Sequence, residues 1–142
     1  MPELIHEPDW ASGSRGRVLV EATEWGVREM ISTVLRREGF ATVACPGPEG
    51  AGQRCSLAAG HGCQAAEQAD VVVHALRSSD ARNLEALRAL RERLPDTPVV
   101  VEAPPMVAER RAADFAGCTV VDAPITAPAL LDAVERALGR SS

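Results

Sequence analysis

Hydrophobic residues in this chain occur as short β-branched runs that alternate with segments in which apolar positions recur every three or four residues. The clearest run is residues 69–76, where three consecutive valines are flanked by polar segments. A run of this kind is typical of a strand that is buried on both faces of a sheet. Similar runs predict four further strands, at residues 17–22, 40–45, 98–103 and 118–122.

Helices are predicted between these strands. In the first helix the apolar positions share one face, and they are Val27, Met30, Ile31, Val34 and Leu35. Thr23 is expected to be its N-cap with Glu24 in the first turn, and Gly39 is expected to end it. Ser79 or Asp80 is expected to cap the next helix. The remaining helices are predicted over residues 81–94, 106–116 and 127–138.

Strands and helices that alternate about five times indicate an α/β fold with a parallel sheet covered on both faces. Right-handed crossovers then favour a flavodoxin-like, doubly wound sheet of five strands in the order 2-1-3-4-5. Residues 46–68 break the alternation. They are rich in Gly, Pro and Cys and replace the second helix, with a turn expected at 56–59 and a short helix at 64–68.

The composition fits one soluble domain. The chain has 142 residues, of which 46% are hydrophobic, and its formal net charge is −5. This charge disfavours nucleic-acid binding, and no apolar run approaches the roughly 18 residues of a membrane span. With no signal-peptide pattern, we expect a cytoplasmic protein. We expect residues 1–16 and 140–142 to be tails around one domain at 17–139, with Trp10 able to dock on that domain.

Six pieces of the sequence, in this order and at this spacing, resemble the receiver domain of bacterial response regulators. They are Arg17–Val20, Val27–Glu29, Arg36–Phe40, Ala69–Val73, Pro98–Val101 and Ala123–Pro124. The resemblance covers about residues 17–138.

The resemblance implies a phosphorylation pocket, but this chain departs from the family at its positions. Ala22 and Thr23 stand where receivers have the acidic pair that holds Mg²⁺, and Ala75 stands at the phosphate-accepting Asp. Ala103 replaces the switch Thr or Ser, and Ala123 replaces the Lys. Phosphoryl transfer needs a carboxylate nucleophile, a divalent cation and a basic side chain. We therefore expect a degenerate pseudo-receiver that is not phosphorylated.

A polar residue precedes each of the four alanines at these positions, and these residues are Glu21, His74, Glu102 and Asp122. They come near the carboxyl ends of neighbouring strands, where open α/β sheets bind ligands. Because side chains alternate along a strand, we expect this polar band to point away from the former pocket. Carboxylates beside a histidine could bind a hard metal or Zn²⁺. The alternative is that these groups bond to loop amides and to one another.

Three cysteines in the irregular segment, Cys45, Cys55 and Cys63, follow the spacing C-x9-C-x7-C, and His61 precedes the last of them. Three thiolates and one imidazole could hold Zn²⁺, and thiolates could hold an Fe–S cluster. The alternatives are incidental thiols, one disulfide, or a redox-sensing pair, which would need exposed thiols of low pKa. Cys118 is predicted to be a core cysteine.

The sequence thus predicts a stand-alone bacterial signalling module of the two-component type. Neither a phosphate-binding glycine pattern nor a nucleophile motif is present, so we expect no enzymatic activity. The resemblance implies that another signalling protein, or a second copy, binds through the last helix and strand five. The alternative is a metal- or redox-responsive sensor that uses Cys45, Cys55 and Cys63, with His61 as a further candidate.

Overall fold

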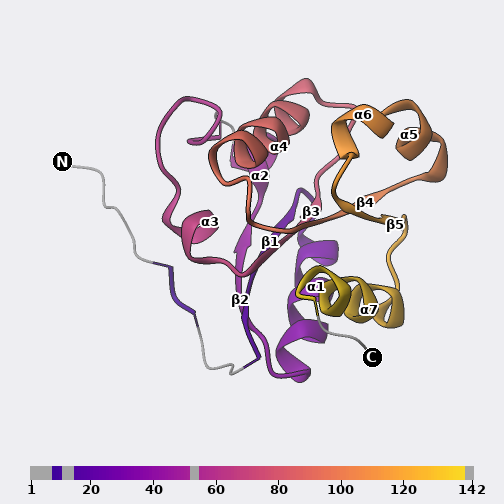
Figure 1. The fold of residues 1–142 in the computed structure, drawn as a ribbon. Coiled ribbons are helices and arrows are strands. Elements are labelled where there is room, and N and C mark those ends of the chain that lie inside the picture. The colour runs from indigo at the N-terminus through magenta and orange to yellow at the C-terminus, as the bar shows by residue number, and fades with distance from the viewer. Residues whose placement is uncertain (1–7, 11–14, 52–54, 140–142) are drawn as a thin grey trace.

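In the computed structural model, which describes residues 8–10, 15–51 and 55–139, the described strands form one parallel sheet. Its order is β2-β1-β3-β4-β5, and Figure 1 shows the strands passing through the centre of the molecule. The strands are β1 (Arg17–Ala22), β2 (Ala41–Cys45), β3 (Val71–Ala75), β4 (Val99–Ala103) and β5 (Thr119–Asp122). The predicted flavodoxin-like fold and its strand order are confirmed.

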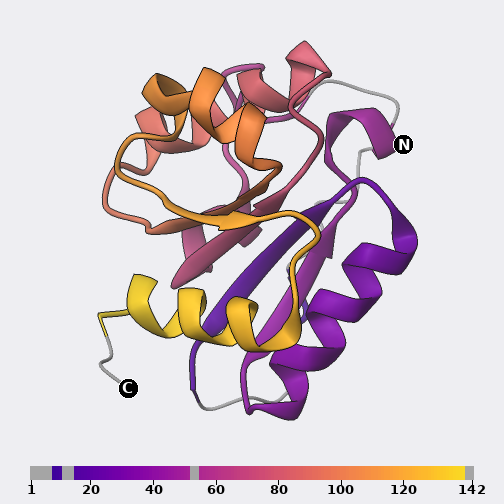
Figure 2. The ribbon, with the colours of Figure 1, turned by 90° about the vertical axis from the view of Figure 1, so that its right-hand side faces the viewer.

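Helices cover both faces of the sheet. The first face packs against α1 (Trp25–Arg37) and α7 (Ala127–Ala137), which lie together on one side of the sheet in Figure 2. The helices of the second face are α2 (Gly47–Ala51), α3 (Gln64–Gln68), α4 (Ala81–Arg93), α5 (Pro105–Arg110) and α6 (Ala112–Phe115). Because side chains alternate along a strand, Val18 and Val20 enter the first core, whereas Leu19 enters the second.

Helix termini differ in places from the prediction. The N-cap of α1 is Glu24 and not Thr23, so no acidic side chain lies in its first turn. Hydrogen bonds from the Arg28 guanidinium to the carbonyl oxygens of Ala22 and Thr23 hold this loop, which shifts the helix start one residue along. Of the two caps predicted for α4, Ser79 and Asp80, the structure has Asp80, which accepts a hydrogen bond from the amide of Arg82 at 2.9 Å.

The helix predicted over residues 106–116 is interrupted. The structure has α5 and α6 instead, and Arg111 between them leaves helical geometry at φ −105° and ψ 22°. No residue of α5 is fully buried, whereas Phe115 of α6 is 3% exposed and lies in the second core. The interruption lets the short α6 carry this aromatic ring inward while α5 stays at the surface.

Part of the predicted N-terminal tail docks on the domain, and the rest of residues 1–16 lies largely outside the described residues. The indole Nε1 of Trp10 donates a hydrogen bond to Oε1 of Gln68 at 2.8 Å. The guanidinium of Arg17 lies 5.6 Å from the centre of the Trp10 ring. Each helix in the described part of the chain is too short or too polar to span a bilayer.

Candidate functional site

A cavity of about 200 Å³ opens at the carboxyl edge of the sheet, where the resemblance predicts the phosphorylation pocket of a receiver domain. We call it the carboxyl-edge cavity. Its lining comes from the ends of the strands and the loops that follow them, namely Thr23, Glu24, Val27, Ala75, Leu76, Arg77, Ser78, Glu102, Pro104 and Ala123. Strand ends at this edge are the usual ligand site of open α/β sheets.

Four of the five positions that the resemblance assigns to the reacting groups of a receiver hold alanine in this chain. Ala75 and Ala123 line the carboxyl-edge cavity, and Ala22 is fully buried beside β3. Ala103, which is predicted to belong to this pocket, does not line the cavity; it lies on the opposite face, in the second core, because side chains alternate along β4 and Glu102 faces the cavity. A methyl group can neither accept a phosphoryl group nor bind a metal ion. The hydroxyl of Thr23 is buried with no hydrogen-bond partner among the described residues.

Glu102 lies in the carboxyl-edge cavity, which corrects the prediction that the polar band points away from it. The reason is the register of the strands. His74 of β3 pairs with Val101 of β4, so Glu102 is aligned with Ala75 and shares its side of the sheet. The Glu102 carboxylate accepts a hydrogen bond from the amide of Ile125 at 2.7 Å, which ties β4 to the loop before α7.

Glu21 and His74 form a buried pair on the second face of the sheet. They are directly opposite each other on β1 and β3, and Nδ1 of His74 lies 2.9 Å from Oε1 of Glu21. The two residues are 8% and 2% exposed. Asp122, the remaining member of the predicted polar band, is exposed at the end of β5. The four residues therefore do not form one ligand set.

A second cavity, of about 260 Å³, lies between the ends of β1 and β2 and the irregular segment that follows β2. We call it the cysteine cavity, because Cys45, Cys55 and Cys63 all line it. Glu21 also lines it, so its carboxylate faces both His74 and this cavity. The predicted turn and short helix at residues 56–59 and 64–68 are confirmed, and they form the outer wall.

Burial disfavours the thiolate form of Cys45 and Cys63 in this cavity. It raises the pKa of Cys45 from 9.0 to about 12, and the Glu21 carboxylate adds to this effect. Burial raises the pKa of Cys63 in the same way. Reactive and metal-binding cysteines need the opposite surroundings, which stabilise a thiolate.

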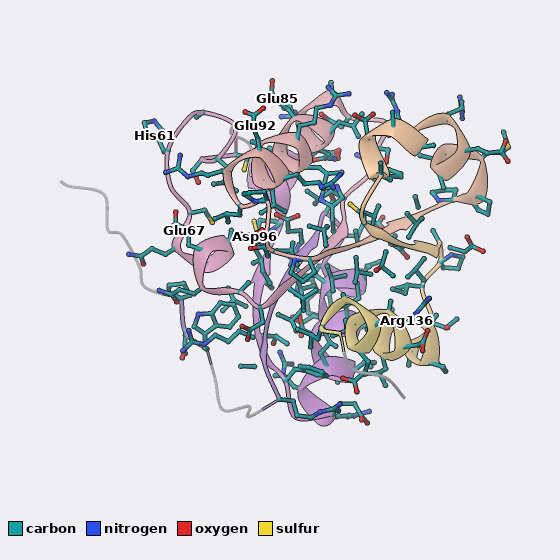
Figure 3. All side chains as sticks on the ribbon, viewed as in Figure 1. His61, Glu67, Glu85, Glu92, Asp96 and Arg136 are labelled. Carbon is teal, nitrogen blue, oxygen red and sulfur yellow. The ribbon has the colours of Figure 1, made fainter. Side chains whose placement is uncertain are left out.

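The fourth member of the predicted metal set lies apart from the cysteines. His61 is exposed and does not line the cysteine cavity, and Figure 3 shows its side chain projecting away from the sheet. No group of three His, Cys, Asp or Glu side chains among the described residues has the geometry of a metal site. Cys118 is half-buried against the second core, and burial raises its pKa too.

The predicted partner surface lies at the opposite edge of the sheet from the cysteine cavity. β5 is an edge strand, and Val120 at its middle is 39% exposed. Met106, on the neighbouring α5, is 70% exposed. Figure 3 places Arg136 on the surface of α7. We call the surface formed by α5, β5 and α7 the edge face.

Solved structures of receiver domains share this fold. The receiver domain of NtrX from Brucella abortus superposes with a TM-score of 0.64 at 24% identity, over 87% of this chain and 99% of that domain. The chemotaxis protein CheY4 of Vibrio cholerae gives 0.63 at 19% identity, over 88% and 100%. A longer NtrX chain, in complex with ATP, gives 0.65 at 22% identity and matches 89% of this chain but 27% of its own length.

These matches confirm the receiver fold that the resemblance predicted. At such identities they define the architecture and not the chemistry of the site. No protein-family model and no curated protein matches the sequence.

Proposed function

We propose that this protein is a receiver-like signalling module of the two-component type that acts through protein–protein contacts and without phosphorylation. The observation that carries the proposal is the presence of Ala75 and Ala123 in the carboxyl-edge cavity of a receiver fold. Without a carboxylate nucleophile and a basic side chain at these positions, the route to a phosphoaspartate is missing. A signal would then enter and leave this domain by binding.

The edge face supports a contact with another signalling protein or with a second copy of this chain. An edge strand presents unpaired backbone groups that can bind a partner strand or loop. Val120 and Met106 add exposed apolar side chains beside it. The exposed residues of α7 include Asp132 and Arg136, which form an ion pair at 3.1 Å.

The proposal is tested by substitutions on two faces of the domain. Val120→Asp and Arg136→Glu change the edge face, and Glu92→Arg is the control on the exposed side of α4. Each variant is expressed with an affinity tag in the source cells, cross-linked, and compared by mass spectrometry, while sedimentation measures self-association. We expect the edge-face variants to lose the contact that the wild type and Glu92→Arg retain. A contact that survives both edge-face substitutions would contradict the proposal.

A second candidate function is a metal- or redox-responsive sensor, and one observation favours it: Cys45, Cys55 and Cys63 line one cavity. The raised pKa values of Cys45 and Cys63 argue against it, because they lower the fraction of each cysteine that is present as the thiolate. Metal analysis and thiol titration of anaerobically purified protein separate the two candidates. Near-stoichiometric zinc or iron, with fewer than four titratable thiols, would favour the sensor. Four free thiols and no metal would exclude a metal sensor.

A further inference from the structure

The cysteine cavity exists because small side chains cover the outer half of the sheet. On the second face, α4 packs its leucines against β3 and β4, whereas β1 and β2 are covered by one-turn helices. These short helices, α2 and α3, contribute small residues to the lining of the cavity, such as Gly47, Ala65 and Ala66. Leu19 and Leu57 are the largest apolar side chains in the lining. Side chains of this size leave space that a full second helix would fill.

The volume of the cavity is that of a small organic molecule. A closed apolar cavity of about 150 Å³ is enough to bind benzene, and this cavity measures about 260 Å³. The additional space is enough for a short alkyl chain attached to an aromatic ring or to a branched aliphatic group. Binding pockets for small molecules typically combine such an apolar wall with a small number of polar groups that fix orientation.

Glu21 is the charged residue of the lining. The other described lining residues are apolar side chains, thiols, glycine and one serine, Ser56, which is exposed at the rim. The thiols of Cys45 and Cys63 are neutral at pH 7, because burial raises their pKa. Among the described lining residues the one charged group is therefore the Glu21 carboxylate, and a carboxylate inside an apolar wall attracts a cationic hydrogen-bond donor.

We propose that the cysteine cavity binds a small organic cation with an apolar body, of the arylalkylammonium type, through an ion pair with Glu21. His74 acts as a positioning residue. Its ring nitrogen Nδ1 lies 2.9 Å from Oε1 of Glu21, and His74 itself is 2% exposed and does not line the cavity. The carboxylate is thus held in place from one side and presented to the cavity on the other.

This site is independent of the edge face. It lies against β1 and β2, while the edge face is built on β5 at the far edge of the sheet. Loss of a protein contact through Val120 or Arg136 would leave the cavity intact. Failure of either proposal can therefore be observed without the other.

The test is a titration of the ¹⁵N-labelled full chain with phenethylammonium and with 2-phenylethanol, its neutral analogue of similar shape, followed by two-dimensional NMR. We expect phenethylammonium to bind about tenfold more tightly than the alcohol, because it adds a charge-assisted hydrogen bond to Glu21. Glu21→Gln should bring the two affinities together. Ala65→Leu fills the cavity and should weaken both, whereas Ala89→Leu, on α4 outside the lining, should weaken neither.

A second measurement keeps the proposal testable if Ala65→Leu does not fold. Nuclear Overhauser contacts between the probe ring and the methyl groups of Leu19 and Leu57 are expected in the wild type. Equal affinity for the cation and the alcohol would overturn the proposal, as would binding that ignores Glu21→Gln. The absence of saturable binding at millimolar probe, or binding without these contacts, would overturn it as well.

Discussion

The thiol of Cys45 lies beside a carboxylate in a buried cavity, and both surroundings act against its ionisation. Desolvation is the larger effect, and the negative charge of Glu21 adds to it. The amide of Gly47, which donates a hydrogen bond to the sulfur at 3.4 Å, acts in the opposite direction but does not offset them. The cysteine spacing in the sequence could not reveal this, because burial decides the state of a thiol.

We predict that Cys45 makes the protein less stable at high pH. In the unfolded chain its thiol ionises near 9.0, whereas in the folded chain it keeps its proton to about 12. Between these values the unfolded state binds fewer protons, so the free energy of unfolding falls as pH rises. Urea denaturation from pH 8 to 11 should show this fall. Cys45→Ala should make it smaller, and an unchanged slope would contradict the assigned pKa.

Glu21 is predicted to stabilise the fold through His74. Glu21→Ala leaves a buried imidazole without its partner, and we expect it to lower the free energy of unfolding by about 1–3 kcal/mol. Asp122→Ala, at the exposed end of β5, is the matched control and should change it little. Urea denaturation of the two variants compares them directly. If both substitutions changed the free energy of unfolding by the same amount, the Glu21–His74 pair would not contribute specifically to stability.

Among the elements, the long helices follow their apolar periodicity and the short ones do not. The face that predicts α1 is present, and Gly39 ends the helix at φ +95°. The choice between Ser79 and Asp80 as the cap of α4 was open in the sequence, because both side chains can accept the amide hydrogen bond. The break between α5 and α6 depends on the position that Phe115 takes in the second core. The apolar pattern of residues 106–116 alone does not indicate that position.

Two glycines, Gly47 at the start of α2 and Gly26 in α1, are expected to respond in opposite ways to substitution by alanine. Gly47 has φ +76°, and a Cβ atom there would lie 2.5 Å from Cδ2 of Leu76. We expect Gly47→Ala to lower the free energy of unfolding by about 1–3 kcal/mol, from backbone strain and crowding. Gly26 in α1 has open space around it, so Gly26→Ala should raise it by about 0.5–1 kcal/mol. Calorimetry that finds the same sign for both would contradict this geometry.

At the scale of the whole molecule, the sequence predicts the sheet order and both helical layers, because five buried strands with helical crossovers have few other arrangements. It predicts the polar band poorly, because the register of β3 against β4 cannot be determined from either strand alone. In this register the last residue of β3, Ala75, is opposite Glu102, one residue before the end of β4. This register places Glu102 beside Ala75, while Glu21 and His74 face the second core. The convergence of three cysteines on one cavity depends on the path of an irregular segment, which no periodicity describes.

The measurement that tests the central claim most directly is incubation of the protein with Mg²⁺ and a small phosphodonor such as acetyl phosphate. Intact-mass spectrometry and two-dimensional NMR with beryllofluoride follow the outcome, and a receiver domain that carries the phosphate-accepting Asp is the positive control. We predict no added phosphoryl mass and no shifted resonances around Ala75. A stoichiometric, base-labile phosphoryl adduct, or a beryllofluoride-induced change at the carboxyl-edge cavity, would contradict signalling without phosphorylation.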